Sequence, residues 1–188
     1  MNLIHYHNTL QLSGPCVITV GSFDGVHLGH QALLQQMKSY AEENNLNSVV
    51  FTFNPHPQEV LKNKPDFFLI NSFEQKITLF EKIGIDAVVV IPFSKEFSKQ
   101  TPINFFEEFI FSKINVKAVF IGPNHHFGKQ REGDANTLAH LCEEKNIKLF
   151  TAQEFRIDGV EVRSTLIREY LKQKDWKGAE RLMGYGMR

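Results

Sequence analysis

Five short apolar runs recur along the chain, separated by segments in which apolar residues return every three or four positions. The runs are rich in Val, Ile and Phe and are continuous rather than alternating, which is typical of strands covered on both faces. The expected strands are Cys16–Val20, Ser48–Phe53, Ala87–Ile91, Ala118–Ile121 and Ile147–Phe150.

The segments between these runs predict amphipathic helices. The first covers Leu28–Asn44 and has one apolar face. The second begins at Ser72, with Gln75 three positions later as a capping box, and ends at Gly84. Further helices are expected from Thr101-Pro102, over Ala135–Lys145, from Ser164 to Lys172, and from Asp175 to Gly184.

Strands that alternate with helices predict parallel strands joined by right-handed crossovers. We therefore expect an α/β fold, a doubly wound, Rossmann-like parallel sheet of five strands with helices on both faces. With 188 residues, the chain is expected to form one domain, residues 1–188. Ligands of such sheets bind at the carboxyl ends of the strands.

A tight turn with three glycines follows the first expected strand, over residues 21–30. A strand, a glycine turn and a helix start bring free backbone N–H groups and the positive end of a helix to one point, which is a typical phosphate site. His27 and His30 are three positions apart, so they share one face of the first helical turn. Both imidazoles can therefore reach a phosphate held there.

Two other interpretations of this turn are weaker. An ordinary turn with two solvent-facing histidines does not account for Gly21, Asp24, Gly25 and Gly29 around the pair. Structural zinc needs four ligands, often cysteines, and the two cysteines of the chain, Cys16 and Cys142, have no paired spacing. We therefore expect no metal site built from the protein's own side chains.

The pattern Gly-x-Phe-Asp-Gly-x-His-x-Gly-His resembles the nucleotide-binding motif of the His-x-Gly-His nucleotidyltransferase superfamily. Within it, the chain resembles the adenylyltransferase module of the prokaryotic bifunctional riboflavin kinase/FMN adenylyltransferases, the FAD synthetases. The resemblance implies that His27 and His30 act on the transferred phosphate. It also implies that the turn binds nucleotide through Gly21, Phe23, Asp24, Gly25 and Gly29.

A second motif follows the second expected strand and reads Phe53-Asn54-Pro55-His56-Pro57. By itself it predicts a stiff, irregular loop with one histidine. It resembles the Phe-x-Pro-His-Pro loop of FAD synthetases, which implies that Phe53, Pro55, His56 and Pro57 help to form the flavin side of the site. The segment after it, Leu61–Leu69, has no clear period and is interpreted as a flap or lid.

A third motif follows the fourth expected strand, over residues 122–133. By itself it is compatible with a solvated basic loop. It resembles Gly-x-Asp-Phe-x-Phe-Gly-x-x-Arg-x-Gly, and the resemblance implies binding roles for Asn124, Phe127 and Arg131. Asn124 replaces the acidic residue of the pattern and His125 replaces an aromatic one, so a polar group that can hydrogen-bond a substrate is retained at position 124.

A fourth motif, Arg163-Ser164-Thr165-Leu166-Ile167-Arg168, begins the helix expected from Ser164. No Glu or Gln lies three residues after either hydroxyl residue, so no capping box competes for the free amides. An ordinary capped helix with a surface arginine is the alternative. The motif resembles Ser-Thr-x-x-Arg, which implies that Ser164, Thr165 and Arg168 hold the outer phosphates of ATP; Arg163 replaces a serine common in the family.

The resemblance implies transfer of AMP from ATP to FMN, with FAD and pyrophosphate as products and Mg²⁺ arriving with ATP. One alternative is a nucleotidyltransferase of the same fold that uses another acceptor, such as nicotinamide mononucleotide. Another is a module that binds nucleotide without turnover. Full-length family members continue into a riboflavin kinase module, which we expect this chain to lack.

The composition of the chain mainly serves to exclude classes of function and location. Lys and Arg together number 21, as do Asp and Glu, so the net charge is zero and no global field favours nucleic acid or a membrane. The start of the chain is too polar for a secretory signal, and no apolar run is long enough to cross a bilayer. With two distant cysteines, this favours a cytoplasmic protein with small-molecule partners.

Overall fold

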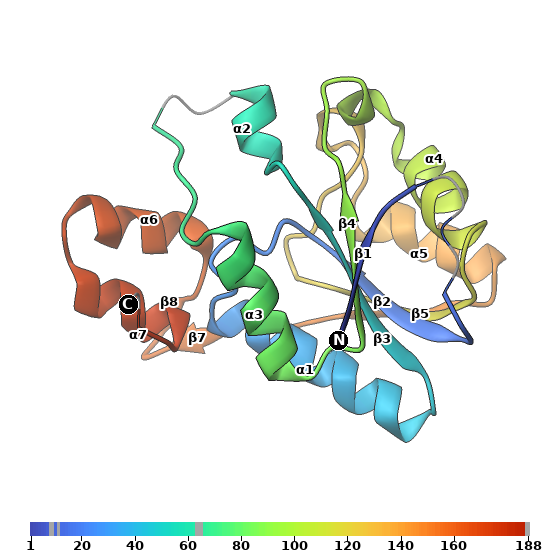
Figure 1. The fold of residues 1–188 in the computed structure, drawn as a ribbon, viewed down its shortest axis with the longest axis horizontal. Coiled ribbons are helices and arrows are strands. Elements are labelled where there is room, and N and C mark those ends of the chain that lie inside the picture. The colour runs from blue at the N-terminus through green and yellow to red at the C-terminus, as the bar shows by residue number, and fades with distance from the viewer. Residues whose placement is uncertain (8–9, 11, 63–65, 187–188) are drawn as a thin grey trace.

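The structure is a computed structural model that describes residues 1–7, 10, 12–62 and 66–186. Its centre is a fully parallel sheet of six strands in the order β1-β4-β3-β2-β5-β6 (Figure 1). The strands are β1 (Asn2–His5), β2 (Cys16–Val20), β3 (Asn47–Phe53), β4 (Ala87–Ile91), β5 (Val116–Ile121) and β6 (Lys148–Thr151).

Helices connect these strands and extend beyond them. The α-helices are α1 (Leu28–Glu43), α2 (Pro57–Leu61), α3 (Phe73–Ile83), α4 (Pro102–Phe106), α5 (Ala135–Glu144), α6 (Ser164–Lys172) and α7 (Trp176–Met183). The 3-10 helices are η1 (Phe97–Lys99) and η3 (Lys129–Arg131), and a π-helix, η2 (Glu107–Phe111), continues α4. A hairpin of β7 (Arg156–Ile157) and β8 (Val160–Glu161) precedes α6.

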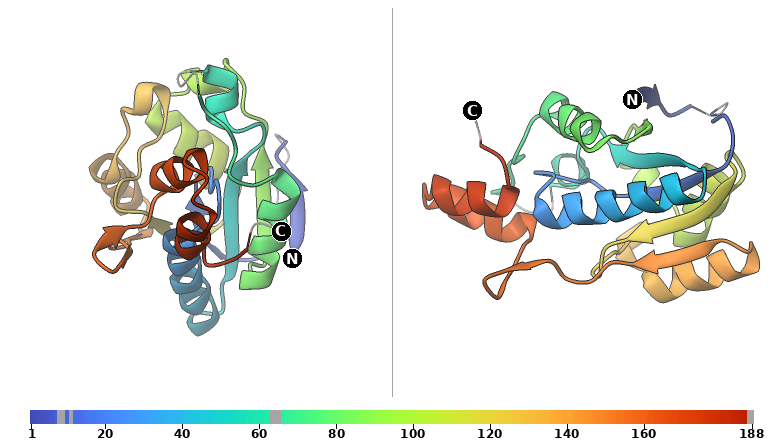
Figure 2. Two further views of the ribbon diagram at one scale, coloured as in Figure 1. Left: turned by 90° about the vertical axis from the view of Figure 1, so that its left-hand side faces the viewer. Right: turned by 90° about the horizontal axis from the view of Figure 1, so that it is seen from below.

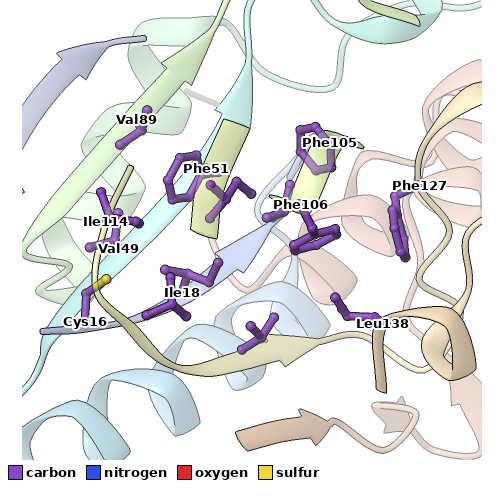
Figure 3. Close-up of a cluster of buried hydrophobic side chains, with 14 of the residues drawn as sticks. Cys16, Ile18, Val49, Phe51, Val89, Phe105, Phe106, Ile114, Phe127 and Leu138 are labelled. Carbon is purple, nitrogen blue, oxygen red and sulfur yellow. The ribbon is translucent and has the colours of Figure 1, made fainter. Parts of the chain in front are cut away.

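The sheet separates two hydrophobic clusters because successive side chains of a strand point to opposite faces. In β2, Ile18 packs with the cluster under α4 and α5, which includes Phe106 and Leu138 (Figure 3). Val17 packs on the other face with Leu34 of α1 and with α3. Every residue of β2 is buried, as expected for a strand covered on both faces.

The C-terminal helices form a separate corner beside the start of α1. Helices α6 and α7 pack on each other and lie beyond the sheet, at the end where α1 begins (Figure 2). A third apolar cluster joins Ile167 of α6 and Met183 of α7 to Ile70, with Leu28 against it. The Gln31 side chain donates to the carbonyls of Val26 and Met183, both at 2.8 Å, which fastens this corner to α1.

The structure confirms the predicted α/β architecture, with one strand more than expected. All five predicted strands are present within two residues of their predicted ends. The additional strand β1 pairs with β4 at an edge; its exposed, mixed residues gave no apolar run. The capping box of Ser72 and Gln75 and the left-handed cap at Gly84 are confirmed.

Two further predictions concern the region after β3. The prediction of an irregular loop there is wrong in part, because helix α2 begins at Pro57, with a capping box between His56 and Glu59. The proposed lid, Leu61–Leu69, includes residues 63–65, which lie outside the described residues; Leu61 ends α2. Across the described ranges, no helix has the length and apolar character needed to span a bilayer.

Candidate active site

The site begins in the turn between β2 and α1. Within it, Phe23, Gly25 and Val26 have positive φ angles of 48°, 81° and 32°. Such angles are unfavourable for residues with a side chain, and most of all for a β-branched one. An added Cβ at Gly25 would lie 3.1 Å from the Ile70 side chain. The turn is therefore held in a strained shape that the surrounding contacts impose.

The two histidines of the first motif stack on each other at the start of α1. Their ring centroids are 3.6 Å apart and the rings are 15° from parallel. His27 is the N-cap residue, and its Nδ1 accepts a hydrogen bond of 3.3 Å from the His30 amide. Under the pair, Phe23 is buried and meets the His30 ring edge-on. The structure thus places Phe23 in the core, where it supports His30.

Both imidazoles are neutral at physiological pH. Burial lowers the pKa of His27 to about 4, and the charge of Arg168 acts in the same direction. Burial, followed by the charges of His27 and Lys76, holds the pKa of His30 well below its usual range. Because Nδ1 of His27 accepts a hydrogen bond, the proton of its neutral ring is on Nε2. His27 therefore presents an N–H donor rather than a cation.

Asp24 and Arg168 join the first and fourth motifs. The Arg168 guanidinium donates to the Asp24 carboxylate in a buried ion pair. The carboxylate also accepts from the Ile70 amide at 3.1 Å. Burial raises the pKa of Asp24, while the Arg168 charge and the Ile70 amide act in the opposite direction. Three donor groups of Arg168 are engaged, since Nε and Nη1 bond to the carbonyls of Phe68 and Ser164.

The start of α6 reaches the same turn. Ser164 donates its hydroxyl to the Asp24 carbonyl at 2.9 Å. Arg163, the N-cap residue, makes no side-chain capping bond, and Thr165 is exposed in the first turn. The predicted absence of a capping box is confirmed. The first amides of α6 therefore point out of an uncapped helix end that carries two hydroxyl groups.

The Pro-His-Pro loop lies at the end of β3, next to β2 in the sheet. The Asn54–Pro55 peptide bond is cis, and Pro57 is the first residue of α2. The His56 and Phe67 rings stack with their centroids 4.8 Å apart. The Arg168 guanidinium lies 4.6 Å from the centre of the Phe67 ring. Phe53, half-buried, packs edge-on against Phe93. The second motif is therefore linked to Arg168 through Phe67.

The third motif is at the carboxyl end of β5 but is less closely connected. Phe127 is buried in the core against Phe106, with ring centroids 4.8 Å apart. Asn124 and Arg131 are exposed. Within the described part of the chain, neither makes a hydrogen bond or ion pair with His27, His30 or Arg168. The structure thus gives Phe127 a packing position and leaves Asn124 and Arg131 exposed to solvent.

Sequence reasoning missed several residues of the site. Lys76 of α3 is 6% exposed, and its ammonium group donates to the carbonyl of Ser22 in the first-motif turn. Asn71 is also buried and accepts from the Gly25 amide at 3.0 Å. Tyr185 donates to the Gly25 carbonyl. Of these three residues, only Lys76 could have been noticed in the sequence, because it is a charged residue between Phe73 and Phe80 on the apolar face of a predicted helix.

Comparisons with known proteins agree with this geometry. The model of a family described as FAD synthetase matches residues 10–166. A bifunctional riboflavin kinase/FMN adenylyltransferase of Haemophilus influenzae is 33% identical over 178 residues, and one of Buchnera aphidicola is 30% identical over 179. These alignments cover 95% of this chain and 58% and 57% of the two relatives. A crystal structure described as a macrolide-efflux protein from Streptococcus pneumoniae superposes with a TM-score of 0.88 at 25% identity, covering 100% of this chain and 72% of the other.

Proposed function

The chain belongs to the FAD synthetase family, and we propose that it transfers AMP from ATP to FMN, giving FAD and pyrophosphate. It spans little more than half the length of the curated relatives it matches, so their kinase activity is not part of this proposal. The observation that carries the proposal is the junction of the first and fourth motifs. Ser164 and Arg168 both bond to Asp24, which brings two phosphate-binding helix starts to one turn.

The reaction needs no covalent enzyme intermediate. A phosphate oxygen of FMN attacks the α-phosphorus of ATP and forms the new P–O bond. The bond from the α-phosphorus to the bridging oxygen breaks, and pyrophosphate leaves with that electron pair. Catalysis then consists of alignment and of stabilising the charge on the α-phosphate and on the leaving group.

The two helix starts divide this work. His27, through its Nε2–H, and His30 stabilise the α-phosphate. Backbone amides of the same turn hold it in place, apart from those of Gly21, Gly25 and Val26, which bond within the protein. Ser164, Thr165 and the free amides of α6 hold the outer phosphates. Arg168 has five N–H groups, of which three bond to described residues. The two without a partner in the described part of the chain are assigned to phosphate oxygens.

The flavin side of the site is assigned to the second motif. Phe53, Pro55, His56 and Pro57 shape the wall at the end of β3, and His56 already stacks on a flat ring, that of Phe67. Asn124 and Arg131 are exposed in the segment after β5, and we assign their polar groups to the nucleotide.

Mg²⁺ accompanies ATP in this proposal. The described residues hold no cluster of three or more His, Cys, Asp or Glu side chains that could bind a metal ion, and the Asp24 carboxylate is engaged by Arg168 and Ile70. The ion would be held chiefly by phosphate oxygens and water, as is common for Mg²⁺ in nucleotide sites.

The test is pyrophosphate release from ATP and Mg²⁺ with FMN, riboflavin or nicotinamide mononucleotide as the acceptor. We expect FAD to form with FMN and the reaction to fall sharply in His30→Ala. Turnover with nicotinamide mononucleotide alone would overturn the flavin assignment, and binding of ATP without release of pyrophosphate would indicate a non-catalytic module.

A further inference from the structure

The ammonium group of Lys76 is buried between the loops of the first two motifs. It lies 3.2 Å from the Ser22 carbonyl, 3.2 Å from Oγ1 of Thr52 and 3.4 Å from the Phe53 carbonyl. The Thr52 hydroxyl also donates to the Ser22 carbonyl. One side chain from α3 therefore joins the turn after β2 to the end of β3, where the Pro-His-Pro loop begins.

All three acceptors are neutral. Among the ion pairs formed by the described residues, none includes Lys76. A buried charge without a paired counter-charge is costly, and three hydrogen bonds reduce that cost without neutralising the charge. The positive potential of Lys76 therefore extends into its surroundings.

Those surroundings form a small pocket at the carboxyl edge of the sheet, and its polar lining residues are Asp24, Asn54, His56, Glu59, Asn71, Ser72 and Lys76. Asn71 is 8% exposed, and its Nδ2 is buried without a hydrogen-bond partner among the described residues. A buried cation and a residue with an unpaired amide donor in the lining of one pocket favour an anion there. Two carboxylates share this pocket, and both have partners: Asp24 is bound by Arg168, and Glu59 accepts from the His56 amide at 2.9 Å.

We propose that Lys76 determines specificity for the phosphorylated acceptor, by holding a positive charge beside the pocket that receives the phosphate of FMN. The inference rests on the proposed function and deepens it, since it names the group that distinguishes FMN from riboflavin. Lys76 acts through its field and by fixing the Ser22 and Phe53 carbonyls, so it is a positioning residue.

The charge of Lys76 gives the preference a pH dependence. Burial lowers the pKa of Lys76 to about 8, while Asp24 and Glu59 act in the opposite direction. His30 and His56 also face this charge, and it contributes to their lowered pKa values. A phosphate monoester gains its second negative charge near a pKa of about 6. Preference for FMN over riboflavin should therefore rise through pH 6 and decline above pH 8, as the ammonium loses its proton.

The experiment measures the Kd of FMN and of riboflavin by quenching of flavin fluorescence, for the wild type and for Lys76→Met. Removing a buried charge near a phosphate is expected to weaken FMN binding by about tenfold or more, with riboflavin binding changed less than twofold. Lys82→Met, an exposed lysine of the same helix, is the matched control and should bind both flavins like the wild type.

The outcomes separate the two proposals. A wild type that binds neither flavin overturns the proposed function. A folded Lys76→Met protein that keeps the wild-type preference for FMN overturns the inference alone. If circular dichroism shows that Lys76→Met is unfolded, Lys76→Arg decides, because arginine stays charged. A preference for FMN that persists above pH 8 in Lys76→Arg supports the inference, and an alkaline decline identical to that of the wild type contradicts it.

Discussion

Asp24 and Arg168, which are 144 positions apart in the sequence, form a buried ion pair that connects the turn after β2 to the first turns of α6. The Asp24 side chain is 5% exposed and that of Arg168 is 15% exposed. The pair makes the two ends of the phosphate site one unit, so the position of Arg168 depends on a carboxylate from the opposite end of the chain.

Arg168→Ala should therefore affect both activity and stability. The loss of a cationic donor is expected to lower kcat for FAD formation by about 10²–10³-fold. Leaving Asp24 buried without its partner should cost roughly 3–5 kcal/mol of unfolding free energy. The measurements are steady-state kinetics and urea denaturation.

A second substitution separates these two effects. Asp24→Asn in the Arg168→Ala background removes the unpaired charge, so it should recover part of the stability and none of the activity. Recovery of activity in the double variant would show that Arg168 acts only by neutralising Asp24.

His27 combines a capping bond with the proposed contact to the α-phosphate, and two variants distinguish them. Asn is a good N-cap residue, so His27→Asn should be more stable than His27→Ala by about 1 kcal/mol. Both variants lack the imidazole and should lose FAD formation to a similar extent. If His27→Asn is as active as the wild type, the imidazole is required only as a cap.

A substitution at Gly25 tests whether the strained backbone of the turn after β2 is needed to position the histidines. Gly25→Ala puts a Cβ at a φ of 81° and within 3.1 Å of the Ile70 side chain, so the turn must shift and carry the histidines with it. We expect lower stability, by about 1 kcal/mol or more, together with a large loss of kcat. Gly122→Ala is the matched control. Apart from its chain neighbours, no atom of the described residues lies within 4 Å of its added Cβ, and its φ is not positive. Equal behaviour of the two variants would contradict this account.

The sheet could be predicted because burial on both faces leaves continuous apolar runs such as Cys16–Val20. Helix ends could be predicted where the Ser72 side chain caps the first turn of α3 and where Gly84 adopts the left-handed conformation that ends it. The strand β1 could not, because an exposed edge strand of four residues has little hydrophobic pattern.

Within the site, local motifs predicted which strand ends carry chemistry but not how side chains pair across the fold. The ion pair of Asp24 with Arg168 and the burial of Lys76 depend on tertiary packing, which spacing along the chain does not encode. For the same reason, Phe23 and Phe127, assigned to ligand binding by resemblance, were not recognised as core residues. The sequence of a motif does not distinguish an aromatic residue that contacts a ligand from one that packs in the core.

His125 offers a test through pH, because burial, followed by the charges of His126 and Arg131, lowers its pKa to about 4. An unfolded histidine has a pKa of about 6.5, so between pH 6.5 and pH 4 the unfolded chain binds a proton that the folded chain does not. The free energy of unfolding should therefore fall as the pH falls through this window, and His27 and His56, with pKa values of about 4, contribute in the same sense. His125→Phe keeps a ring next to Phe127, which His125 stacks on at 5.5 Å, and removes one titrating group. Urea denaturation of this variant from pH 4 to pH 8 gives its free energy of unfolding at each pH. Between pH 4 and pH 6.5, the slope of this free energy against pH should be smaller than in the wild type by about one proton, and it should be unchanged at higher pH. An unaltered slope in the acidic window would show that His125 is protonated in the folded protein.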